Sequence, residues 1–554
     1  MKKILSLVLA LAMLLTVASA FATDVDAVGG MEPNWWVNAD VKPSTEFYVD
    51  GGMTVSMVGV HFNQYPTTFD GGYYFPTIEK MTGVHFDIDW RTSDGYSTVV
   101  STILAGGVDS LPDILQPSSS QTSSGMSVSA LADEGAIIAL DDYLDLIPNV
   151  VAAVGEDRMA MWRSADGHIY TLPTIVNVPG SQSMTFRKDW ALKLKDQGVI
   201  DFDTPTTWDQ WKAFWYGVRD NDVNGNGDPS DEIPLVLEMG ESGERALHAL
   251  LNAFGIKASN DAQFCVLDDG SYTMVYDHPN YRKFLTEVQQ LYADKILDPE
   301  FATRKQADMY NTMSANICAS CFTWAQMSQT HTEELWSMGI EDALFECVAP
   351  ITGPDGESWL QERQAVTPLN CITAKAEKDG KVENILKFFN WQFSEEGINL
   401  YNYGIEGLTY TVVDGQPTLN TGIVKNGFTD YRTIGMECEP FGGMWQTSAF
   451  MQCLFAGESL ETLNPAYQSF WNGLNNEGVN KGHYYAMPPT LETSAYTEYR
   501  GELIVGSTGI CTLRDQCVAG QLSVDDFFAK YEELKARGLQ EVIDEGNEAY
   551  QVIK

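Results

Sequence analysis

The sequence predicts an α/β protein whose long chain is shared between two lobes, and three observations support this fold class. The chain has 554 residues, which is too many for a single hydrophobic core. Hydrophobic residues make up 44% of it and aromatic residues 11%, enough to build sizeable cores rather than a disordered chain. Short apolar runs alternate with helical patterns near the amino end, which is typical of an open, mostly parallel sheet with helices on both faces.

The amino-terminal 22 residues have the form of a secretory signal peptide. A basic pair at 2–3 precedes an apolar stretch at 4–17, and the small-residue sequences ASA at 18–20 and AFA at 20–22 are candidate cleavage sites. A membrane anchor is the alternative, but the apolar stretch is shorter than the roughly 20 residues that span a bilayer. We therefore expect a secreted or cell-surface protein that acts outside the cytoplasm.

The next part of the chain predicts a tether followed by alternating strands and helices. Residues 23–50 lack a sustained period and contain a Gly pair and two prolines, as expected of a linker. The elements predicted after it are a strand at 54–60, a helix at 75–81, a strand at 84–90, a helix at 96–105 and a strand at 112–115.

The carboxyl ends of these strands define candidate ligand contacts. In open α/β sheets, ligands bind beyond the carboxyl ends of the strands, where the following loops meet at one edge. The loops that begin at His61, Arg91 and Gln116 are therefore expected to converge. The side chains that we expect near a ligand at this edge are His61, Asn63, Arg91 and Ser118.

Tryptophans recur on one face of a helix predicted in the second part of the chain. Thr207 and Gln210 form a capping box for a helix that begins at Trp208. Trp208, Trp211 and Trp215 lie on the same face of this helix. A stripe of this kind could bind a sugar, but the helical spacing favours a face that packs into the core.

The carboxyl end of the chain predicts another amphipathic helix. Ser523 is its expected amino-terminal cap, because an Asp follows three residues later. Phe527, Tyr531 and Leu534 recur at helical spacing after the cap and are expected to face the core.

The composition is strongly acidic. There are 76 Asp and Glu residues against 34 Lys and Arg residues, and the formal net charge is −42. Such a field repels nucleic acid and anionic membranes, so neither is expected as a partner. The charge favours solubility and does not determine the sign of the charge in a binding pocket.

The nine cysteines predict no metal site. Their odd number leaves at least one free thiol or an intermolecular disulfide in an exported chain. Cys318 and Cys321 form a lone CxxC between apolar residues, which favours buried side chains over a redox or zinc site. Cys511 and Cys517 are close enough in the sequence for a short-loop disulfide. No cysteine lies near the candidate cleavage sites, so a lipid-modified amino terminus is not predicted.

The clearest chemical motif is an Asp- and Asn-rich loop, DNDVNGNGDPSDE, at 220–232. Calcium binds six to eight hard oxygen atoms, which alternate positions of a tight loop can supply, and glycine permits the sharp turn. One register begins at Asp220 and places Gly225 sixth; the other begins at Asp222 and places Gly227 sixth. A solvated turn capped by Asp side chains is the alternative to a metal site. The predicted ligands of a structural Ca²⁺ ion are Asp222, Asn224, Asn226, Asp228, Asp231 and Glu232.

Short motifs recur along the chain in a fixed order. They are ILAGG at 103–107, LPDI at 111–114, DGHIY at 166–170, FRKDW at 186–190, PTTW at 205–208, NGNG at 224–227, DEIP at 231–234, FNW at 389–391, YG at 403–404 and EG at 406–407. With these motifs the chain resembles the large extracellular solute-binding proteins of bacterial ABC sugar importers, the family that includes the alginate-binding proteins. The resemblance spans essentially the whole mature chain. The family loop favours the calcium register that begins at Asp222, although this chain has one extra residue before Asp231.

The resemblance implies a periplasmic-binding-protein-like fold, with two α/β lobes, hinge crossings and a ligand cleft between the lobes. The crossings are expected near 174–184, near 366–371 and around Pro440. Lobe 1 is expected to contain residues 51–175 and about 370–440, and lobe 2 about 180–365 and 441–554.

Aromatic and polar side chains are the expected sugar contacts in such a cleft, because sugar rings stack on aromatic faces while their hydroxyls need hydrogen bonds. A buried core position or a surface pair is the alternative for each of them. The aromatic candidates are Trp324, Trp445, Tyr401 and Tyr403, and the polar candidates are Arg187 and Glu406.

The function implied by the resemblance is capture of a sugar or oligosaccharide by lobe closure and its delivery to the membrane subunits of an ABC permease. The protein is expected to act as a monomer and not as an enzyme. A secreted glycosidase is the alternative, which would need two carboxylates that flank the scissile bond. The sequence contains no nucleophile elbow, HExxH or phosphate-binding loop.

Overall fold

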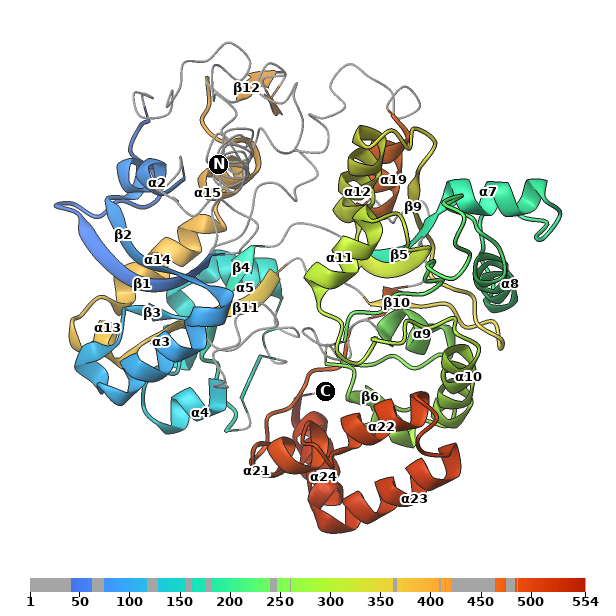
Figure 1. Ribbon diagram of the computed structural model, residues 1–554. Helices are drawn as coiled ribbons and strands as arrows, with labels where there is room; N and C mark the ends of the chain where they lie inside the picture. The colour runs from blue at the N-terminus through green and yellow to red at the C-terminus, as the bar shows by residue number, and fades with distance from the viewer. Residues whose placement is uncertain are drawn as a thin grey trace, which may run out of the picture.

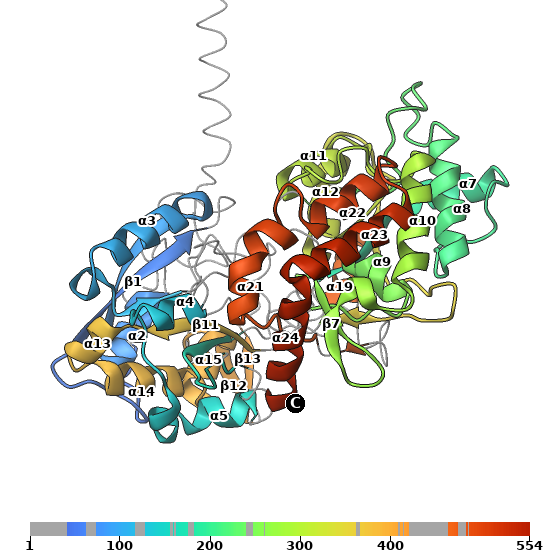
Figure 2. The same cartoon turned by 90° about the horizontal axis from the view of Figure 1, so that it is seen from below.

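The protein folds as two α/β lobes that lie side by side, and two perpendicular views show them as separate bodies (Figures 1 and 2). Among the described residues, no helix combines the length and the apolar character needed to cross a membrane. The computed structural model describes residues 41–61, 74–116, 128–155, 159, 162–164, 166–175, 182–239, 247–259, 261–361, 366–407, 410–413, 415–419, 464–474, 484–485 and 487–553.

Lobe 1 is built on a five-stranded sheet with the order β2-β1-β3-β11-β4. Its strands are β1 (Met53–His61), β2 (Val84–Thr92), β3 (Ile114–Leu115), β4 (Thr171–Ile175) and β11 (Val366–Ile372). Strand β1 is parallel to β2 and β3, whereas β11 is antiparallel to both β3 and β4. The prediction of a mostly parallel sheet is confirmed, with β11 inserted as the antiparallel strand.

The elements predicted for this lobe form close to their expected bounds. The strands predicted at 54–60 and 84–90 are β1 and β2, and the helices predicted at 75–81 and 96–105 are α2 and α3. The last predicted strand is shorter than expected. Only Ile114 and Leu115 form the strand β3, although the backbone N–H of Asp113 also donates to the carbonyl of Ser56 in β1. The helices of lobe 1 are α2 (Tyr74–Thr82), α3 (Ser93–Ala105), α4 (Val128–Asp133), α5 (Pro148–Val154), α13 (Ala374–Lys378), α14 (Val382–Gln392) and α15 (Glu395–Tyr403).

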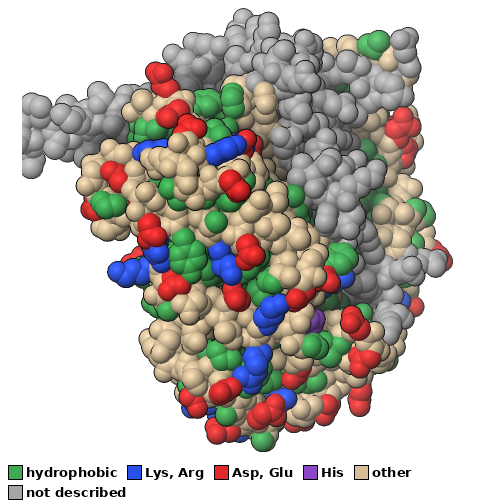
Figure 3. All heavy atoms as spheres, turned by 90° about the vertical axis from the view of Figure 1, so that its right-hand side faces the viewer, with side chains coloured by type: hydrophobic (Ala, Val, Ile, Leu, Met, Phe, Trp, Pro, Cys, Tyr) green, Lys and Arg blue, Asp and Glu red, His purple; other side chains and the backbone are tan. Residues whose placement is uncertain are grey.

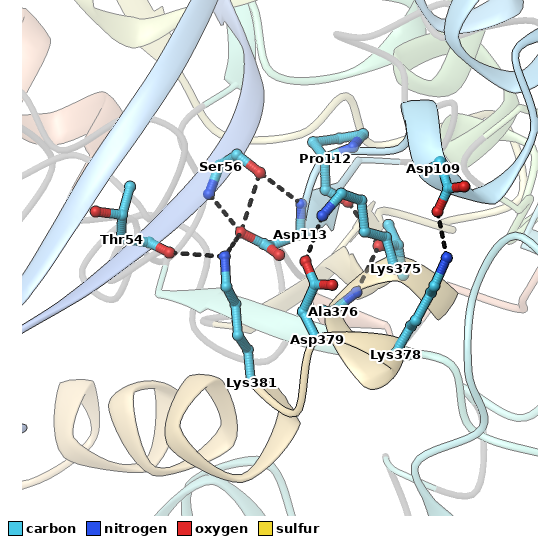
Figure 4. A network of polar contacts seen from close by, with 11 residues as sticks. Thr54, Ser56, Asp109, Pro112, Asp113, Lys375, Ala376, Lys378, Asp379 and Lys381 are labelled. Carbon is cyan, nitrogen blue, oxygen red and sulfur yellow. Dashed lines mark hydrogen bonds and ion pairs between the residues drawn. The ribbon is translucent and has the colours of Figure 1, made fainter.

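A buried ion pair attaches the late segment of lobe 1 to its early strands (Figure 4). The Asp113 side chain is 0% exposed, and its Oδ2 accepts hydrogen bonds from the N–H of Ser56 at 2.7 Å and from Lys381 Nζ at 2.8 Å. Lys381 Nζ also donates to the carbonyl of Thr54 at 2.9 Å. The pair therefore joins β1, the start of β3 and the turn between α13 and α14, near the amino ends of the parallel strands.

Lobe 2 has a three-stranded antiparallel sheet with the order β8-β5-β9. Its strands are β5 (Gln182–Arg187), β8 (Ser320–Trp324) and β9 (Phe345–Val348). Phe186 packs against Trp211 on one face of the sheet, with ring centroids 5.8 Å apart. On the other face, Thr185 contacts Cys347, and helices α12 (Ala325–Ser337) and α19 (Pro465–Leu474) cover β9.

The tryptophan helix of lobe 2 is α8 (Trp208–Arg219), and its stripe faces the core as predicted. Trp208, Trp211 and Trp215 are 2%, 0% and 0% exposed, so they offer no surface to a sugar. The Thr207 and Gln210 capping box is present in both directions. The other described helices of lobe 2, apart from the carboxyl-terminal group, are α7 (Lys188–Asp196), α9 (His248–Ala253), α10 (Tyr281–Ala293) and α11 (Gln306–Ser314).

Four helices at the carboxyl end complete lobe 2, and α21 and α24 lie on its side toward lobe 1 (Figures 1 and 2). They are α21 (Ser494–Tyr499), α22 (Ile510–Val518), α23 (Val524–Leu534) and α24 (Gln540–Ile553). The predicted cap is confirmed, since the Asp526 N–H donates to Ser523 Oγ at 3.0 Å. Phe527, Tyr531 and Leu534 are buried as predicted.

Two-stranded ribbons extend both lobes. In lobe 2, β6 (Phe264–Val266) pairs with β7 (Tyr272–Met274), and β10 (Leu360–Gln361) pairs with β14 (Tyr484–Tyr485). In lobe 1, β12 (Tyr410–Val413) pairs with β13 (Gln416–Leu419).

Between consecutive described segments, the chain changes from one lobe to the other three times. It leaves the lobe 1 sheet after Ile175 and enters β5 at Gln182, returns between Gln361 and Val366, and passes again between Leu419 and Pro465. The residues within these passages, including Pro440, lie outside the described ranges. One buried apolar cluster contains most of the lobe 1 core, and Ala325, Cys347 and Phe470 of lobe 2 belong to the same cluster.

Candidate functional site

The carboxyl ends of β1 and β2 lie at the same edge of the lobe 1 sheet, as the sequence predicts. In the register of the two strands, His61 pairs with Thr92 and Val60 pairs with Arg91. The Arg91 side chain is exposed and forms an ion pair with Asp89 at 2.6 Å. The side chain of His61 and the residues Asn63 and Ser118 lie outside the described residues.

The residue that follows β3, the third strand at this edge, forms a buried polar contact that the sequence did not indicate. Gln116, which follows β3, is 2% exposed, and its Nε2 donates to Oδ1 of the fully buried Asn370 at 3.0 Å. The hydroxyl of Tyr96 donates to the Gln116 carbonyl at 3.0 Å. Asn370 lies 254 positions further along the chain, at an irregularity of β11, and sequence spacing could not relate it to Gln116.

Trp324 lies at the end of the lobe 2 sheet, next to a passage between the lobes. It is the last residue of β8 and pairs with Gln182, the first residue of β5 after the chain enters lobe 2. It is partly buried and directly precedes α12. Trp324 is therefore the aromatic sugar candidate whose side chain lies within the described residues.

A small apolar hollow adjoins this end of the sheet. Trp359 lies in its wall and was not predicted as a candidate, although an aromatic residue just before the second passage was a usable signal. The Lys257 ammonium lies 3.3 Å from the centroid of the Trp359 ring, and the indole N–H donates to Glu357. The lining residues are Ser183, Met184, Ala249, Phe322, Val348, Pro350, Ile351, Trp359 and Leu360.

Arg187 lies inside lobe 2 and not on a surface that a sugar could reach. Its side chain is 1% exposed and binds both carboxylate oxygens of Asp189, at 2.9 and 2.6 Å. Its guanidinium lies over the ring of Trp190 at 4.3 Å and also donates to Oδ1 of Asn316. The contacts of Arg187 thus favour a role within the lobe over contact with a ligand.

The remaining sugar candidates are placed only in part. Tyr401 and Tyr403 belong to α15, but their side chains lie outside the described residues, as does all of Trp445. Glu406 is exposed in the turn after α15, where its backbone forms an isolated bridge with Tyr410.

The Asp222 loop, residues 222–232, forms the tight turn that the calcium prediction requires. The two oxygens of Asp222 accept hydrogen bonds from the N–H groups of Gly225 at 2.7 Å and Gly227 at 2.9 Å. Asn224 Oδ1 accepts from the N–H of Asn226 at 2.9 Å. Gly225 and Gly227 have φ values of 77° and 94°, a region that non-glycine residues rarely adopt. Asp222, Asn224 and Asn226 therefore turn their oxygens toward the loop.

The structure favours the register that begins at Asp222. Asp220 is committed elsewhere, since both of its oxygens accept hydrogen bonds from Arg219, at 2.7 and 2.8 Å. Asp231 instead faces the loop and accepts hydrogen bonds from the side-chain amides of Asn224 at 3.1 Å and Asn226 at 2.6 Å. The side-chain Oδ1 of Asp228 accepts a hydrogen bond from the Ser230 N–H at 3.1 Å. The backbone carbonyl of Asp228 is the predicted ligand at the seventh position of the loop.

The buried carboxylate of Glu232 is the feature of the loop that best supports a cation site. It is 8% exposed, and its Oε1 accepts from the N–H of Asn224 at 3.1 Å. Its Oε2 is buried and has no hydrogen-bond partner among the described residues. Burial raises the pKa of this carboxyl group. A buried carboxylate oxygen without a partner is costly unless a cation or donor binds it.

The acidic side chains of the loop do not form a metal cluster by themselves. In the part of the chain that the structure describes, no group of three or more His, Cys, Asp or Glu side chains is placed to hold a metal ion. The donor set predicted for calcium also contains Asn amide oxygens and a backbone carbonyl, which are ordinary calcium ligands. The residues present are thus compatible with calcium through a mixed set of oxygen donors.

The Asp222 loop is attached to the strand that ends at Trp324. The Ile233 N–H donates to the carbonyl of Ile317 at 2.8 Å, and the Ala319 N–H donates to the carbonyl of Ile233 at 3.0 Å. Lys193 of α7 holds the start of the loop by donating to the carbonyl of Val223 at 2.9 Å. The loop is therefore part of the framework of lobe 2.

The described cysteines are buried thiols. Cys318 and Cys321 are both 0% exposed, and the hydrogen bond to Cys318 together with burial raises the pKa of Cys321. Cys511 and Cys517 are free, so the short-loop disulfide does not form in this structure. Burial also raises the pKa of Cys517 to about 11. These thiols are suited to packing rather than to redox or metal chemistry.

The exposed face of lobe 2 shows no dominant apolar patch (Figure 3). Asp and Glu side chains are scattered over it, with Lys and Arg side chains between them, and most of the remaining coloured surface consists of other side chains and backbone. This mixed surface is consistent with the acidic composition.

The fold is similar to that of known sugar-binding proteins. No protein-family model matches the sequence, and a comparison with curated proteins finds no match. Many solved structures match the chain, and among those that align over almost their whole length are the following three. The alginate-binding protein AlgQ2 without calcium ion has a TM-score of 0.67 at 18% identity, and the alignment covers 92% of this chain and 100% of that one.

The other two are ABC-transporter proteins. The substrate-binding protein FusA of Streptococcus pneumoniae in complex with kestose has a TM-score of 0.63 at 19% identity, covering 90% of this chain and 99% of that one. A solute-binding protein of Bifidobacterium longum infantis that binds HMO has a TM-score of 0.62 at 18% identity, covering 91% and 99%. The chain therefore has the two-lobed, periplasmic-binding-protein-like fold of ABC-transporter solute-binding proteins.

Proposed function

We propose that this protein is the extracytoplasmic solute-binding component of an ABC importer, and that it captures a sugar or oligosaccharide by lobe closure. The observation that carries the proposal is the two-lobed fold, which matches sugar-binding proteins of this class from end to end. Hinge closure around a ligand is the general mode of such two-lobed binding proteins. The ligand is then delivered to the permease subunits in the membrane.

The position of Trp324 supports a sugar as the ligand. This side chain lies where the chain enters lobe 2, and the apolar hollow with Trp359 adjoins the same end of the sheet. Aromatic rings at such a place can stack on the apolar faces of sugar rings. A neutral sugar is favoured, because Arg91 and Arg187, the two cations suggested by the sequence as ligand contacts, are already paired with Asp89 and Asp189.

The proposal is tested by calorimetric titration of the mature protein with a panel of oligosaccharides, including kestose, maltotriose and alginate oligosaccharides. We expect at least one to bind and to be recovered intact by chromatography. Trp324→Ala should weaken that binding about tenfold or more, since loss of a stacked aromatic costs roughly 1.4 kcal/mol or more. Cleavage of a bound sugar would instead support the secreted glycosidase.

The matched control for this variant lies on α12, the helix that follows Trp324. Trp336, near the carboxyl end of α12, donates its indole N–H to the carbonyl of Ala343 at 2.7 Å and is partly buried. Trp336→Ala should lower the melting temperature while leaving the sugar affinity unchanged. Equal losses of affinity in both variants would contradict the assignment of Trp324 as a ligand contact.

We further propose that the Asp222 loop binds a structural calcium ion. The unpartnered oxygen of Glu232 and the left-handed glycines support this assignment. A structure of FusA with similar fold is of an EF-hand mutant, and AlgQ2 was solved without calcium ion, so both proteins are connected with such a site. The ion would be held by Asp222, Asn224, Asn226, the Asp228 carbonyl, Asp231 and Glu232, and would stabilise lobe 2 without taking part in any chemistry.

Removal of calcium should lower the melting temperature of the protein. A ligand that binds only the folded state contributes about 2.7 kcal/mol when its concentration is 100 times its Kd, and a chelator removes this contribution. Asp222→Asn should abolish the difference between melts with calcium and with chelator. Asp220→Asn is the control, because Asp220 is engaged by Arg219 and should leave the difference intact. The absence of any chelator effect on the unaltered protein would refute the calcium assignment.

A further inference from the structure

Asn316 has an unusual backbone conformation next to the Asp222 loop. It follows α11 with a φ of 61°, one of three described non-glycine residues with positive φ. Asn adopts this left-handed region more readily than most residues. Its carbonyl accepts a hydrogen bond from Nδ2 of Asn224, at 3.4 Å. Asn316 is thus a residue outside the loop that contacts a predicted calcium ligand.

The side chain of Asn316 is hydrogen-bonded to a buried residue of lobe 2. Its Oδ1 accepts a hydrogen bond from Arg187, which is 1% exposed. Arg187 is itself fixed by the two oxygens of Asp189 and by the rings of Trp190 and Phe345, at 4.3 and 5.5 Å. A planar guanidinium held on so many sides has little freedom, so Asn316 is anchored to the end of β5.

The Asn224 amide is held in one orientation by these contacts. Its Oδ1 accepts from the N–H of Asn226 at 2.9 Å, and its Nδ2 donates to Asp231 and to Asn316. A cation can bind only the oxygen end of an amide, so the nitrogen end must stay turned away from the ion. Asp231 is a predicted ligand and its position depends on the ion. The carbonyl of Asn316 is the acceptor for Nδ2 that does not belong to the loop.

We propose that Asn316 and Arg187 are positioning residues of the calcium site, which hold the Asn224 amide with its oxygen toward the ion. This inference rests on the calcium assignment above. It adds two residues outside the Asp222 loop that orient one of the predicted ligands. Residues that orient metal ligands change metal affinity by 10- to 100-fold when they are replaced. It also gives Arg187, which the sequence suggested as a sugar contact, a role inside lobe 2.

The proposal is tested by calorimetric titration of calcium into the full mature protein. Asn316→Gly keeps the positive φ but removes the acceptor for Arg187, and we expect it to weaken calcium binding by about 10- to 100-fold. Asn316→Asp keeps an oxygen for Arg187 and should restore most of the affinity. Lys295→Gly is the matched control, since Lys295 also follows a helix with a φ of 60°, is exposed, and lies outside the loop.

The outcomes separate this inference from the calcium assignment and from a loss of folding. Asn316→Gly leaves a donor of the buried Arg187 without its acceptor, so its melting temperature in chelator should fall below that of Lys295→Gly. Calcium is therefore titrated at a temperature at which circular dichroism shows both variants to be fully folded, which excludes a loss of folding as the cause of weaker binding. If the unaltered protein binds calcium and Asn316→Gly binds it equally well, the positioning role is wrong and the calcium assignment stands. If the unaltered protein binds no calcium, both are wrong.

Discussion

Asp113 shows how a single buried charge can hold distant parts of the chain together. Its side chain is 0% exposed, and only Oδ2 is engaged, by Ser56 and Lys381. The other oxygen has no hydrogen-bond partner among the described residues. A buried carboxylate of this kind is tolerated only because a cation is in contact with it, so the stability of lobe 1 depends on Lys381.

Replacement of Lys381 should therefore be costly. Removing one partner of a buried ion pair leaves the other charge without compensation, and we expect Lys381→Met to lower the free energy of unfolding of lobe 1 by about 3–5 kcal/mol. Urea titration followed by circular dichroism measures this change. Lys378→Met is the matched control on the same segment. Its pair with Asp109 is exposed at 60% and 79%, and its loss should leave the unfolding midpoint where it was.

Residue types and spacing predicted local roles well and long-range contacts poorly. The caps at Thr207 and Ser523 formed as expected, because capping depends on residues within one turn. Arg187 was chosen as a sugar contact because it is polar and belongs to a family motif. In the structure, Arg187 is buried and bonded to Asp189 and Asn316. Asn316 lies 129 positions away in the sequence. Trp359 was not predicted, although its place just before an expected hinge crossing was a usable signal, because the choice of candidates did not weigh position relative to the crossings.

The packing of helix α19 is another long-range contact that the sequence did not predict. It covers the outer edge of β9, where Ser469 Oγ accepts a hydrogen bond from the N–H of Cys347 at 2.9 Å. Covering an edge strand with a helix protects its free backbone groups. The contact is close, because a Cβ at Gly473 would lie 2.6 Å from Cβ of Ala325 and 2.8 Å from Sγ of Cys347. No periodicity in the sequence relates α19 to a strand more than a hundred residues earlier.

A methyl group at Gly473 should push α19 away from lobe 2. Overpacking at a site without flexible neighbours costs about 1–3 kcal/mol, so Gly473→Ala should lower the melting temperature of lobe 2. Ala325 directly follows Trp324, and we also expect a weaker sugar affinity from this variant. Gly501→Ala is the control, since no atom lies within 4 Å of its added Cβ. A melting temperature for Gly473→Ala equal to that of the control would contradict the close packing.

At the scale of the whole molecule, the alternation of strands and helices predicted the first lobe better than the second. Strands β1 and β2 and helices α2 and α3 form at their predicted places, because each carries its own periodic signal. The return of β11 into the lobe 1 sheet depends on contacts between residues more than 200 positions apart, such as Gln116 and Asn370. Only the resemblance to a family suggested that the chain passes repeatedly between two lobes.

The three passages between the lobes explain how ligand binding could move them as bodies. The two sheets have no strand in common, and the lobe 2 core cluster contains no residue of lobe 1. The lobe 1 cluster, in contrast, includes Ala325, Cys347 and Phe470, so the lobes share an apolar contact beside α12 and α19. A ligand that touches both lobes would favour the closed arrangement in proportion to the contacts it adds there.

Small-angle X-ray scattering of the mature protein, with and without an oligosaccharide that binds in the calorimetric panel, tests the central claim most directly. The account predicts a smaller radius of gyration in the presence of the sugar, with the sugar recovered unchanged. A scattering profile that stays the same at saturating sugar, or a sugar that is cleaved during the measurement, would contradict capture by lobe closure.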